Sequence, residues 1–231
     1  MNDVYSTGQS NPPKVDAEFN TKRVLSTLEL VLPAIKSNTQ KYWFMGSIVP
    51  TALNKSLYRE VHDLDIIVIT KNVDKLLSSL YDLGYKRKPM NFLRVSELLG
   101  VYVFSHSTLL DLGFFVIDEE EKCYSITAGP VRVEIPLENL QAKGYNFTNQ
   151  SFLGIDPSFA YTLSLLHKEN PKRINEFNLY KSLEIIPAKW PIYTIYFFGI
   201  KANWMIDGLN SLLVLIGKIR TKFGLPYDPW Q

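Results

Sequence analysis

Two aspartates separated by one residue are the part of this sequence whose types and spacing could do chemistry. Asp63 and Asp65 stand at the start of Leu64–Thr70 (LDIIVIT), whose β-branched residues predict a buried strand. Side chains two apart on a strand point to the same face, so the two carboxylates would lie side by side. Like charges that close need compensation, and Mg²⁺ or Mn²⁺ bound through oxygen ligands supplies it. Taken alone, an Asp-x-Asp pair also fits solvated side chains where a strand begins.

A Gly-Ser pair precedes the aspartates, with fifteen residues between Ser47 and Asp63. Gly46 and Ser47 follow the apolar run Tyr42 to Met45, which predicts a strand that ends in a tight turn. Glycine lets the backbone approach a phosphate, and the amides and the serine hydroxyl can donate hydrogen bonds to its oxygens. The same pair is also common in ordinary turns. The order of the two motifs is the stronger signal, because it combines phosphate donors and metal ligands in one unit.

In this order of motifs the sequence resembles the nucleotidyltransferase-fold superfamily, also called the polymerase-β-like fold. Met45–Ser47 and Asp63–Ile66 match its pattern of an apolar residue, Gly, Ser, a gap and an Asp-x-Asp with apolar neighbours. The flanking Arg59 and His62 are similar to residues of bacterial and archaeal lincosamide-type and abortive-infection-type nucleotidyltransferases. The resemblance covers residues 40–115. It implies an α+β fold with a mixed β-sheet core and flanking helices.

The resemblance also implies a third carboxylate on a later strand, and Asp111 fits that position. Asp111 is a lone acid in an apolar segment, where burial of an unpaired carboxylate is costly. Metal binding would explain it, and so would a position facing water or an ion pair with Arg94 or Arg132. Glu134 is the competing candidate for the third acid, with Asp118 behind it.

The activity implied by the resemblance is metal-dependent transfer of NMP from an NTP, such as ATP, to a hydroxyl, with release of pyrophosphate. Asp63, Asp65 and Asp111 would be the catalytic residues and would hold two Mg²⁺ or Mn²⁺ ions. The residues expected to bind the nucleotide phosphates are Gly46, Ser47, Arg59, Lys168 and Arg173. The basic cluster around residue 170 also fits a solvated helix end.

Composition excludes several other classes of protein. The chain has 231 residues, of which 46% are hydrophobic and 21% charged, as in ordinary globular proteins. Its net charge of +2 does not favour a long nucleic acid partner. Three scattered histidines and the single Cys123 give no zinc-site spacing, and no histidine adjoins Cys123 to activate its thiol. Glycine-rich dinucleotide and P-loop motifs are absent from the sequence.

The single Cys123 fits a reducing, cytoplasmic setting. The hydrophobic patterning favours a protein without a membrane partner, with membrane association as the minor alternative. The longest uncharged runs in the C-terminal region, Trp190–Ile200 and Gly208–Gly217, have eleven and ten residues, and a spanning helix needs about 20. We expect a flexible arm over residues 1–15, a nucleotidyltransferase-like α+β core over 16–150 and a mainly helical C-terminal subdomain over 151–231. Within that subdomain, helices are expected from Asp156 and again over 192–223.

The sequence leaves the acceptor open. A small molecule or a protein side chain could supply the hydroxyl. The alternative function is a nucleotide-binding regulatory or antitoxin-like protein of the same fold without robust turnover. Aromatic residues between Trp190 and Trp230 suit core packing, an aromatic wall of the binding site, or the interface of a homodimer.

Overall fold

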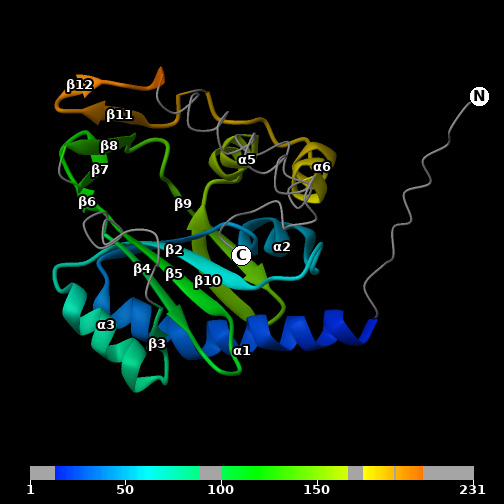
Figure 1. Cartoon of the computed structure of the whole chain (residues 1–231). Coiled ribbons are helices and arrows are strands. Elements are labelled where there is room, and N and C mark those ends of the chain that lie inside the picture. The colour runs from blue at the N-terminus through cyan, green and yellow to red at the C-terminus, as the bar shows by residue number, and fades with distance from the viewer. Residues whose placement is uncertain (1–13, 89–99, 129, 166–173, 190, 205–231) are drawn as a thin grey trace, which may run out of the picture.

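A central β-sheet with helices on both faces forms the core of the molecule (Figure 1). This computed structural model describes residues 14–88, 100–128, 130–165, 174–189 and 191–204. The sheet has seven strands in the order β3-β4-β5-β2-β1-β10-β9. In chain order these strands are β1 (Lys41–Met45), β2 (Asp63–Ile69), β3 (Lys86–Arg87), β4 (Val101–Ser105), β5 (Asp111–Val116), β9 (Ala142–Phe147) and β10 (Gln150–Ile155).

The central sheet is mixed. Strand β2 pairs in parallel with β5, and β1 pairs in parallel with β10, while β1 and β2 run antiparallel to each other. The two outer pairs, β3 with β4 and β9 with β10, are antiparallel, as is β4 with β5. This arrangement brings the end of β1 beside the start of β2, and the start of β2 beside the start of β5.

Helices divide between the two faces of this sheet. The long helix α1 (Lys14–Asn38) and the helix α3 (Val73–Asp82) cover one face (Figure 1). The helices α2 (Ile48–Asn54), α5 (Pro157–Leu165) and α6 (Ile174–Ser182) lie on the other side.

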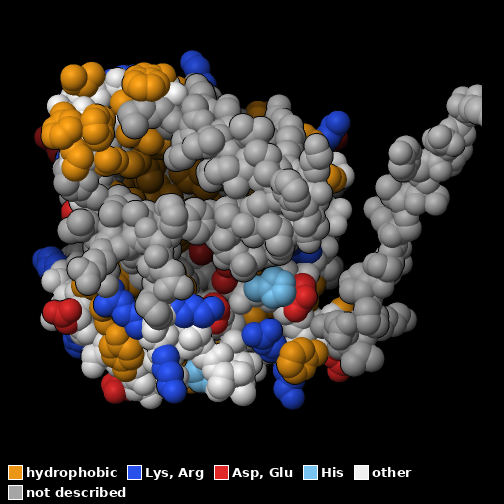
Figure 2. All heavy atoms as spheres, in the orientation of Figure 1, with side chains coloured by type: hydrophobic (Ala, Val, Ile, Leu, Met, Phe, Trp, Pro, Cys, Tyr) orange, Lys and Arg blue, Asp and Glu red, His pale blue; other side chains and the backbone are white. Residues whose placement is uncertain are grey.

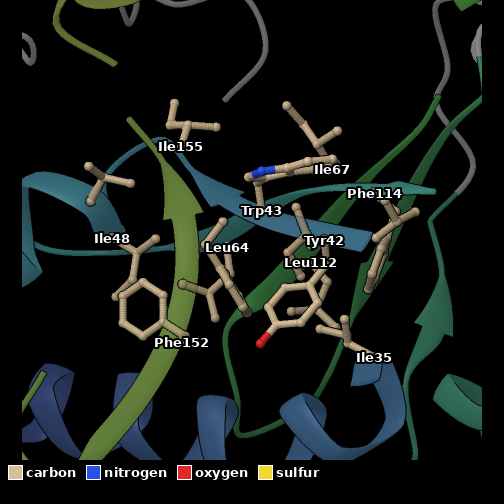
Figure 3. Packing of buried hydrophobic residues seen from close by; sticks show 14 of the residues in the cluster. Ile35, Tyr42, Trp43, Ile48, Leu64, Ile67, Leu112, Phe114, Phe152 and Ile155 are labelled. Carbon is tan, nitrogen blue, oxygen red and sulfur yellow. The ribbon is translucent and has the colours of Figure 1, made fainter. Parts of the chain in front are cut away.

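Alternation along the strands decides which side chains meet which helices. Figure 3 shows Leu64 and Leu112 directed toward α1, where Ile35 lies, and it shows Trp43 and Ile67 on the opposite face. Leu64 and Leu112 are fully buried. Because side chains alternate on a strand, the odd-numbered residues of β2, including both aspartates, face away from α1.

A second, smaller sheet of five strands packs beside the core sheet, in the order β12-β11-β8-β7-β6. Its strands are β6 (Asp118–Glu119), β7 (Cys123–Ala128), β8 (Val131–Pro136), β11 (Thr194–Phe197) and β12 (Ile200–Lys201). The ring of Trp43 on β1 contacts that of Tyr124 on β7 edge-on, with 5.3 Å between centroids. Lys41 Nζ also lies 2.5 Å from Glu119 Oε1.

Several expected elements are confirmed, and others differ. The predicted strands around Tyr42 and Leu64 are β1 and β2, and the helix after Asn72 is α3. The expected helix over residues 192–223 is wrong for 194–201, where β11 and β12 form a hairpin on β8. Its alternating threonine, isoleucine, tyrosine and phenylalanine favour a strand. Strands β9 and β10 were not predicted, and β10 lies inside the core sheet although it begins at the expected boundary.

Exposed apolar side chains gather over β11 and β12 (Figure 2). Phe198, Ile200 and Trp204 are each more than 70% exposed. They belong to the aromatic segment for which the sequence suggested a homodimer interface, and the homodimer stays a prediction. Within the described part of the chain, no helix is both long and apolar enough to cross a membrane.

Candidate active site

Three aspartates lie on one face of the central sheet. The parallel register of β2 and β5 aligns Asp63 with Asp111 and Asp65 with Gly113. Residues aligned in this way on neighbouring strands point to the same face. The Asp111 amide also donates to the His62 carbonyl over 3.2 Å, which fixes the starts of the two strands together. Asp111 is therefore the later acid that stands beside the Asp-x-Asp pair.

Two glycines enclose the carboxylate of Asp65. A Cβ atom built on Gly46 would lie 2.8 Å from Asp65 Oδ2, and one built on Gly113 would lie 2.7 Å from Asp65 Oδ1. Both distances are closer than carbon and oxygen atoms tolerate. Gly46 also has a φ of +69°, a left-handed conformation that favours glycine. The two glycines therefore make the space in which this carboxylate lies.

Ser47 follows the turn made by Gly46, as the sequence predicted. Its side chain is 5% exposed, and its Oγ has no hydrogen-bond partner in the structure. It precedes α2 but makes no side-chain capping bond to that helix. A buried hydroxyl without a partner carries a desolvation penalty, which a bound acceptor oxygen would relieve.

Lys88 is a site residue that the sequence did not indicate. Its Nζ lies 2.5 Å from Asp111 Oδ2, and both side chains are partly exposed. The Lys88 amide donates to the Val103 carbonyl over 2.9 Å, which holds this residue beside the edge of the sheet. The partners suggested for Asp111 by the sequence were arginines. Arg132 instead contacts Glu120 and Glu134, and Arg94 lies outside the described residues.

The carboxylates of Asp63, Asp65 and Asp111 do not converge on one metal position in this structure. Among the residues that the structure describes, no group of three or more His, Cys, Asp or Glu side chains could hold a metal ion. The Asp111 carboxylate instead forms an ion pair with the ammonium group of Lys88. The backbone thus brings three acids to one face, while the side chain of the third is paired with lysine.

Helix α1 holds the segments that lead into both acidic strands. Asn20 is buried, and it both donates to the Val61 carbonyl (2.8 Å) and accepts from the Val61 amide (2.9 Å). Thr27 Oγ1 accepts from the Leu110 amide over 3.1 Å. Tyr85 donates its hydroxyl to the Leu110 carbonyl over 3.3 Å. These bonds fix the backbone one or two residues before Asp63 and Asp111.

A pocket opens next to Asp65, between the sheet and the helices α5 and α6. Its volume is about 130 Å³. The residues that line it are Met45, Gly46, Asp65, Ile155, Ala160, Leu163, Ser164 and Glu176. Glu176 on α6 is only 2% exposed, and Tyr58 donates its hydroxyl to Glu176 Oε2 over 3.2 Å.

Of the basic residues expected to bind the phosphates, Arg59 alone belongs to the part of the chain that the structure describes. Arg59 donates from Nε to the Tyr58 hydroxyl over 3.1 Å, and so connects to the wall of the pocket that Glu176 forms. Lys168 and Arg173 lie outside the described residues. His62 is exposed, and its Nε2 lies 3.6 Å from Glu60 Oε2.

The competing acids and the cysteine belong to the second sheet. Glu134 on β8 is aligned with Thr194 of β11, and its Oε1 lies 2.8 Å from Arg132 Nε. Asp118 is exposed on β6. Partial burial, together with the charges of Glu134 and Glu120, raises the pKa of the Cys123 thiol, so this side chain is not an activated thiolate.

The overall structure is similar to solved antibiotic-modifying nucleotidyltransferases. The crystal structure of the lincosamide antibiotic adenylyltransferase LnuA, bound to lincomycin, matches 70% of this chain and 96% of its own, with a TM-score of 0.54 and 16% identity. The solution structure of the antibiotic-resistance factor ANT(2'')-Ia matches 90% of this chain and 95% of its own, with a TM-score of 0.51 and 11% identity. This chain has the nucleotidyltransferase fold.

A crystal structure of ANT(2'')-Ia in complex with adenylyl-2''-tobramycin agrees with this assignment. It matches 82% of this chain and 95% of its own, with a TM-score of 0.50 and 12% identity. No protein-family model and no curated protein sequence matches the chain. The nucleotidyltransferase fold is thus recognised through its structure and through the motifs around Gly46 and Asp63.

Proposed function

We propose that this protein is a metal-dependent nucleotidyltransferase that moves AMP from ATP to a hydroxyl of a small molecule and releases pyrophosphate. The observation that carries the proposal is the common face on which Asp63, Asp65 and Asp111 lie, next to Gly46 and Ser47. The names of LnuA and of the ANT(2'')-Ia complex describe adenylyl transfer and antibiotic ligands. They therefore suggest ATP as the first donor to test and a small molecule as the first acceptor.

The chemistry of the three acids suits a divalent metal. Carboxylate oxygens are the ligands that Mg²⁺ prefers, and Asp63, Asp65 and Asp111 would hold it once Asp111 leaves Lys88. When bound, Mg²⁺ would neutralise charge on the phosphates and make the acceptor hydroxyl more acidic. Lys88 would then be released next to the same site, where its positive charge favours the leaving pyrophosphate.

The chain's own residues would orient the transfer. The backbone amides of Gly46 and Ser47 and the Ser47 hydroxyl would donate hydrogen bonds to the β- and γ-phosphates. The acceptor oxygen would form a bond to the α-phosphorus as the bond from that phosphorus to the bridging oxygen breaks. The hydroxyl proton would pass to a carboxylate oxygen of Asp111, and pyrophosphate would leave with the bridging oxygen.

The test is release of pyrophosphate from each of the four NTPs in the presence of Mg²⁺ and a panel of hydroxyl acceptors that includes lincomycin and tobramycin. We expect release with at least one donor and acceptor, and a loss of at least about 100-fold in Asp65→Asn and Asp111→Asn. The exposed Asp118 on β6 supplies the control, and Asp118→Asn should keep the full rate. Release that persists in Asp65→Asn would contradict the proposal.

The pairing of Asp111 with Lys88 favours a second candidate function. A third acid that is already neutralised by lysine suits a protein that binds nucleotide without turnover. Such a regulatory or antitoxin-like protein would bind an NTP through Gly46, Ser47 and Asp65. Binding of an NTP, with no release of pyrophosphate from it in the presence of any acceptor, would identify it.

A further inference from the structure

The connection between β4 and β5, residues 106–110, leads directly into Asp111. Any freedom in this connection would reach the Asp111 backbone, and so the position of its carboxylate. The last residue of the connection, Leu110, is held at both backbone groups, because its amide donates to Thr27 and its carbonyl accepts from Tyr85. The residues before it are exposed or partly exposed, so their order must come from other contacts.

The side chain of His106 supplies these contacts. Its Nδ1 accepts from the Thr108 amide and from the Leu109 amide, each over 3.2 Å. Asparagine and aspartate commonly close turns in this way, by accepting from backbone amides a few residues ahead. Arg23 Nη2 completes the arrangement by donating to the Leu109 carbonyl over 3.0 Å. The backbone that precedes Asp111 is therefore tied by side chains at successive residues.

The ring of His106 is itself oriented. Its centroid lies 5.0 Å from that of the Tyr85 ring, at an interplanar angle of 53°. Its Nε2 faces Gly84, where an added Cβ atom would come within 3.2 Å of this nitrogen. Because Nδ1 accepts from the two amides, the proton of the neutral ring lies on Nε2. His106 thus packs against the same tyrosine that holds Leu110, and the connection forms one unit with it.

We propose that His106 is a positioning residue for Asp111, which fixes the start of β5 and thereby holds the Asp111 carboxylate beside Asp63. This inference rests on the proposed function, in which Asp111 binds metal and accepts the proton of the acceptor hydroxyl. His106 acts through the backbone of the connection and not through contact with the nucleotide. A misplacement of a reacting group by about 1 Å can lower a rate about 100-fold, so this support affects the rate of transfer.

Two substitutions separate the hydrogen bonds of His106 from its packing. His106→Asn places an acceptor oxygen at the position of Nδ1, in a residue that commonly accepts from the amides of a turn. His106→Phe keeps an aromatic ring against Tyr85 but has no acceptor atom. Ser107 is exposed in the same connection, and Ser107→Ala is the matched control. A positioning role requires that His106→Asn, and not His106→Phe, behave like the wild type.

Amide hydrogen exchange, followed by NMR, reports on the connection directly. The Leu109 amide should exchange about fivefold faster in His106→Phe, as expected when one hydrogen bond is lost. In His106→Asn and in Ser107→Ala its exchange should stay within about twofold of the wild-type rate. Unchanged exchange of this amide in His106→Phe would show that the connection does not depend on Nδ1, and would overturn the proposal.

The kinetics of pyrophosphate release extend the test to the site. In His106→Phe the kcat should fall at least about tenfold while the KM for the NTP stays within about twofold, because Gly46 and Ser47 are unchanged. His106→Asn and Ser107→Ala should keep the wild-type kcat. A role in packing alone predicts the reverse order, in which His106→Phe retains kcat and His106→Asn loses it, and that result would contradict the positioning role.

Binding of Mn²⁺, measured by EPR without nucleotide, separates this inference from the proposed function. The dissociation constant should rise about tenfold in His106→Phe, as for other residues that orient a metal ligand, and should be normal in His106→Asn. This pattern without pyrophosphate release from any NTP would overturn the proposed function and leave the positioning role. Pyrophosphate release with the wild-type kcat and normal Mn²⁺ affinity in His106→Phe would overturn the positioning role and leave the function in place.

Discussion

Two glycines determine where the central carboxylate can lie. Gly46 and Gly113 approach Asp65 from both sides, and a Cβ at either position would come within 3 Å of a carboxylate oxygen. The sequence indicated Gly46 for its approach to phosphate. It gave no sign of Gly113, because that glycine acts through the register of β5 on β2. The lack of a Cβ atom at these two glycines therefore shapes the site as much as its charged groups do.

Substitution of these glycines should impair the site. In Gly113→Ala the new methyl group would displace the Asp65 carboxylate, and we expect a loss of at least about tenfold in affinity for Mg²⁺-ATP. Gly46→Ala should have the same effect and also lower the free energy of unfolding by about 1 kcal/mol, because alanine resists a positive φ.

Gly144 on β9 provides the matched control for both glycine variants. A Cβ built there meets no atom within 4 Å, and its φ is not positive. Gly144→Ala should therefore keep both the affinity for nucleotide and the stability of the wild type. Calorimetric titration and urea unfolding of the three variants make the comparison. Normal nucleotide affinity in Gly113→Ala would contradict the role assigned to that glycine.

Two buried tyrosines should make stability decline at alkaline pH. Burial raises the pKa of Tyr85 and of Tyr145 well above that of an exposed tyrosine. Between the unfolded and folded pKa values the folded protein retains protons that the unfolded chain has lost, so the free energy of unfolding falls as pH rises. Stability should be constant below about pH 9 and decrease above about pH 10. Urea unfolding across that range, with Tyr85→Phe/Tyr145→Phe, measures the effect, and an equal decrease in the double variant would contradict it.

At the scale of elements, helix α1 is the support of the acidic strands. It covers the face of the sheet opposite the aspartates, yet Asn20 and Thr27 bond to the backbone just before β2 and β5. The acids are therefore positioned by an element that does not itself reach the site. Strain or mobility in these two segments would change the separation of the carboxylates.

Asn20→Ala should reveal this support. Two hydrogen bonds to Val61 are lost, and the buried amide and carbonyl of Val61 are left unsatisfied. We expect a loss of about 1–3 kcal/mol in the free energy of unfolding, measured in urea. Asn178 is exposed on α6, and Asn178→Ala should change stability by less than about 0.5 kcal/mol. Equal stability of the two variants would contradict the account of Asn20.

The sequence predicted the elements whose local signals agree with their environment. The β-branched residues of β2 from Ile66 to Ile69 are all buried, as expected for a strand covered on both faces. The Asn72 side chain caps α3 by accepting a hydrogen bond from the Lys75 amide over 2.9 Å. Helix α2 was missed because Pro50 interrupts a helical pattern only seven residues long. Strands β9 and β10 were missed because glycine and polar residues weaken their alternation.

The candidate site could be predicted for its acids but not for its surroundings. Asp63 and Asp65 were indicated by their place at the start of a predicted strand, and Asp111 by the third carboxylate that the resemblance implies. Lys88 was not, because its contact with Asp111 depends on the pairing of β3 with β4 and of β4 with β5. Glu176 was not, because its burial beside Asp65 results from packing of α6 against the rest of the fold. Such contacts arise only when distant segments assemble.

At the scale of the whole molecule, two sheets are joined through a small aromatic contact. Trp43 on β1 and Tyr124 on β7 are both buried, and their rings meet at 5.3 Å. Trp43 is two residues before Met45, which lines the pocket. Packing between the sheets therefore reaches the strand that carries the Gly-Ser turn.

Tyr124→Ala should destabilise the whole fold. Removal of a buried aromatic ring leaves a cavity, and we expect a loss of about 3–5 kcal/mol in the free energy of unfolding, measured in urea. Phe198 is 74% exposed on the hairpin of β11 and β12. Phe198→Ala removes a comparable ring and should cost less than about 1 kcal/mol. A small effect of Tyr124→Ala would show that the two sheets do not unfold as one unit.

The dependence of thermal stability on nucleotide and Mg²⁺ is the decisive measurement for the proposed site, because it requires no knowledge of the acceptor. Unfolding of the wild type, Asp65→Asn and Asp118→Asn is followed with each of the four NTPs, with and without Mg²⁺. A ligand at about 100 times its Kd stabilises by about 2.7 kcal/mol, which is a clear shift in Tm. We expect a Mg²⁺-dependent shift in the wild type and in Asp118→Asn that is lost in Asp65→Asn. An absence of any shift, or an equal shift in Asp65→Asn, would contradict the proposed site.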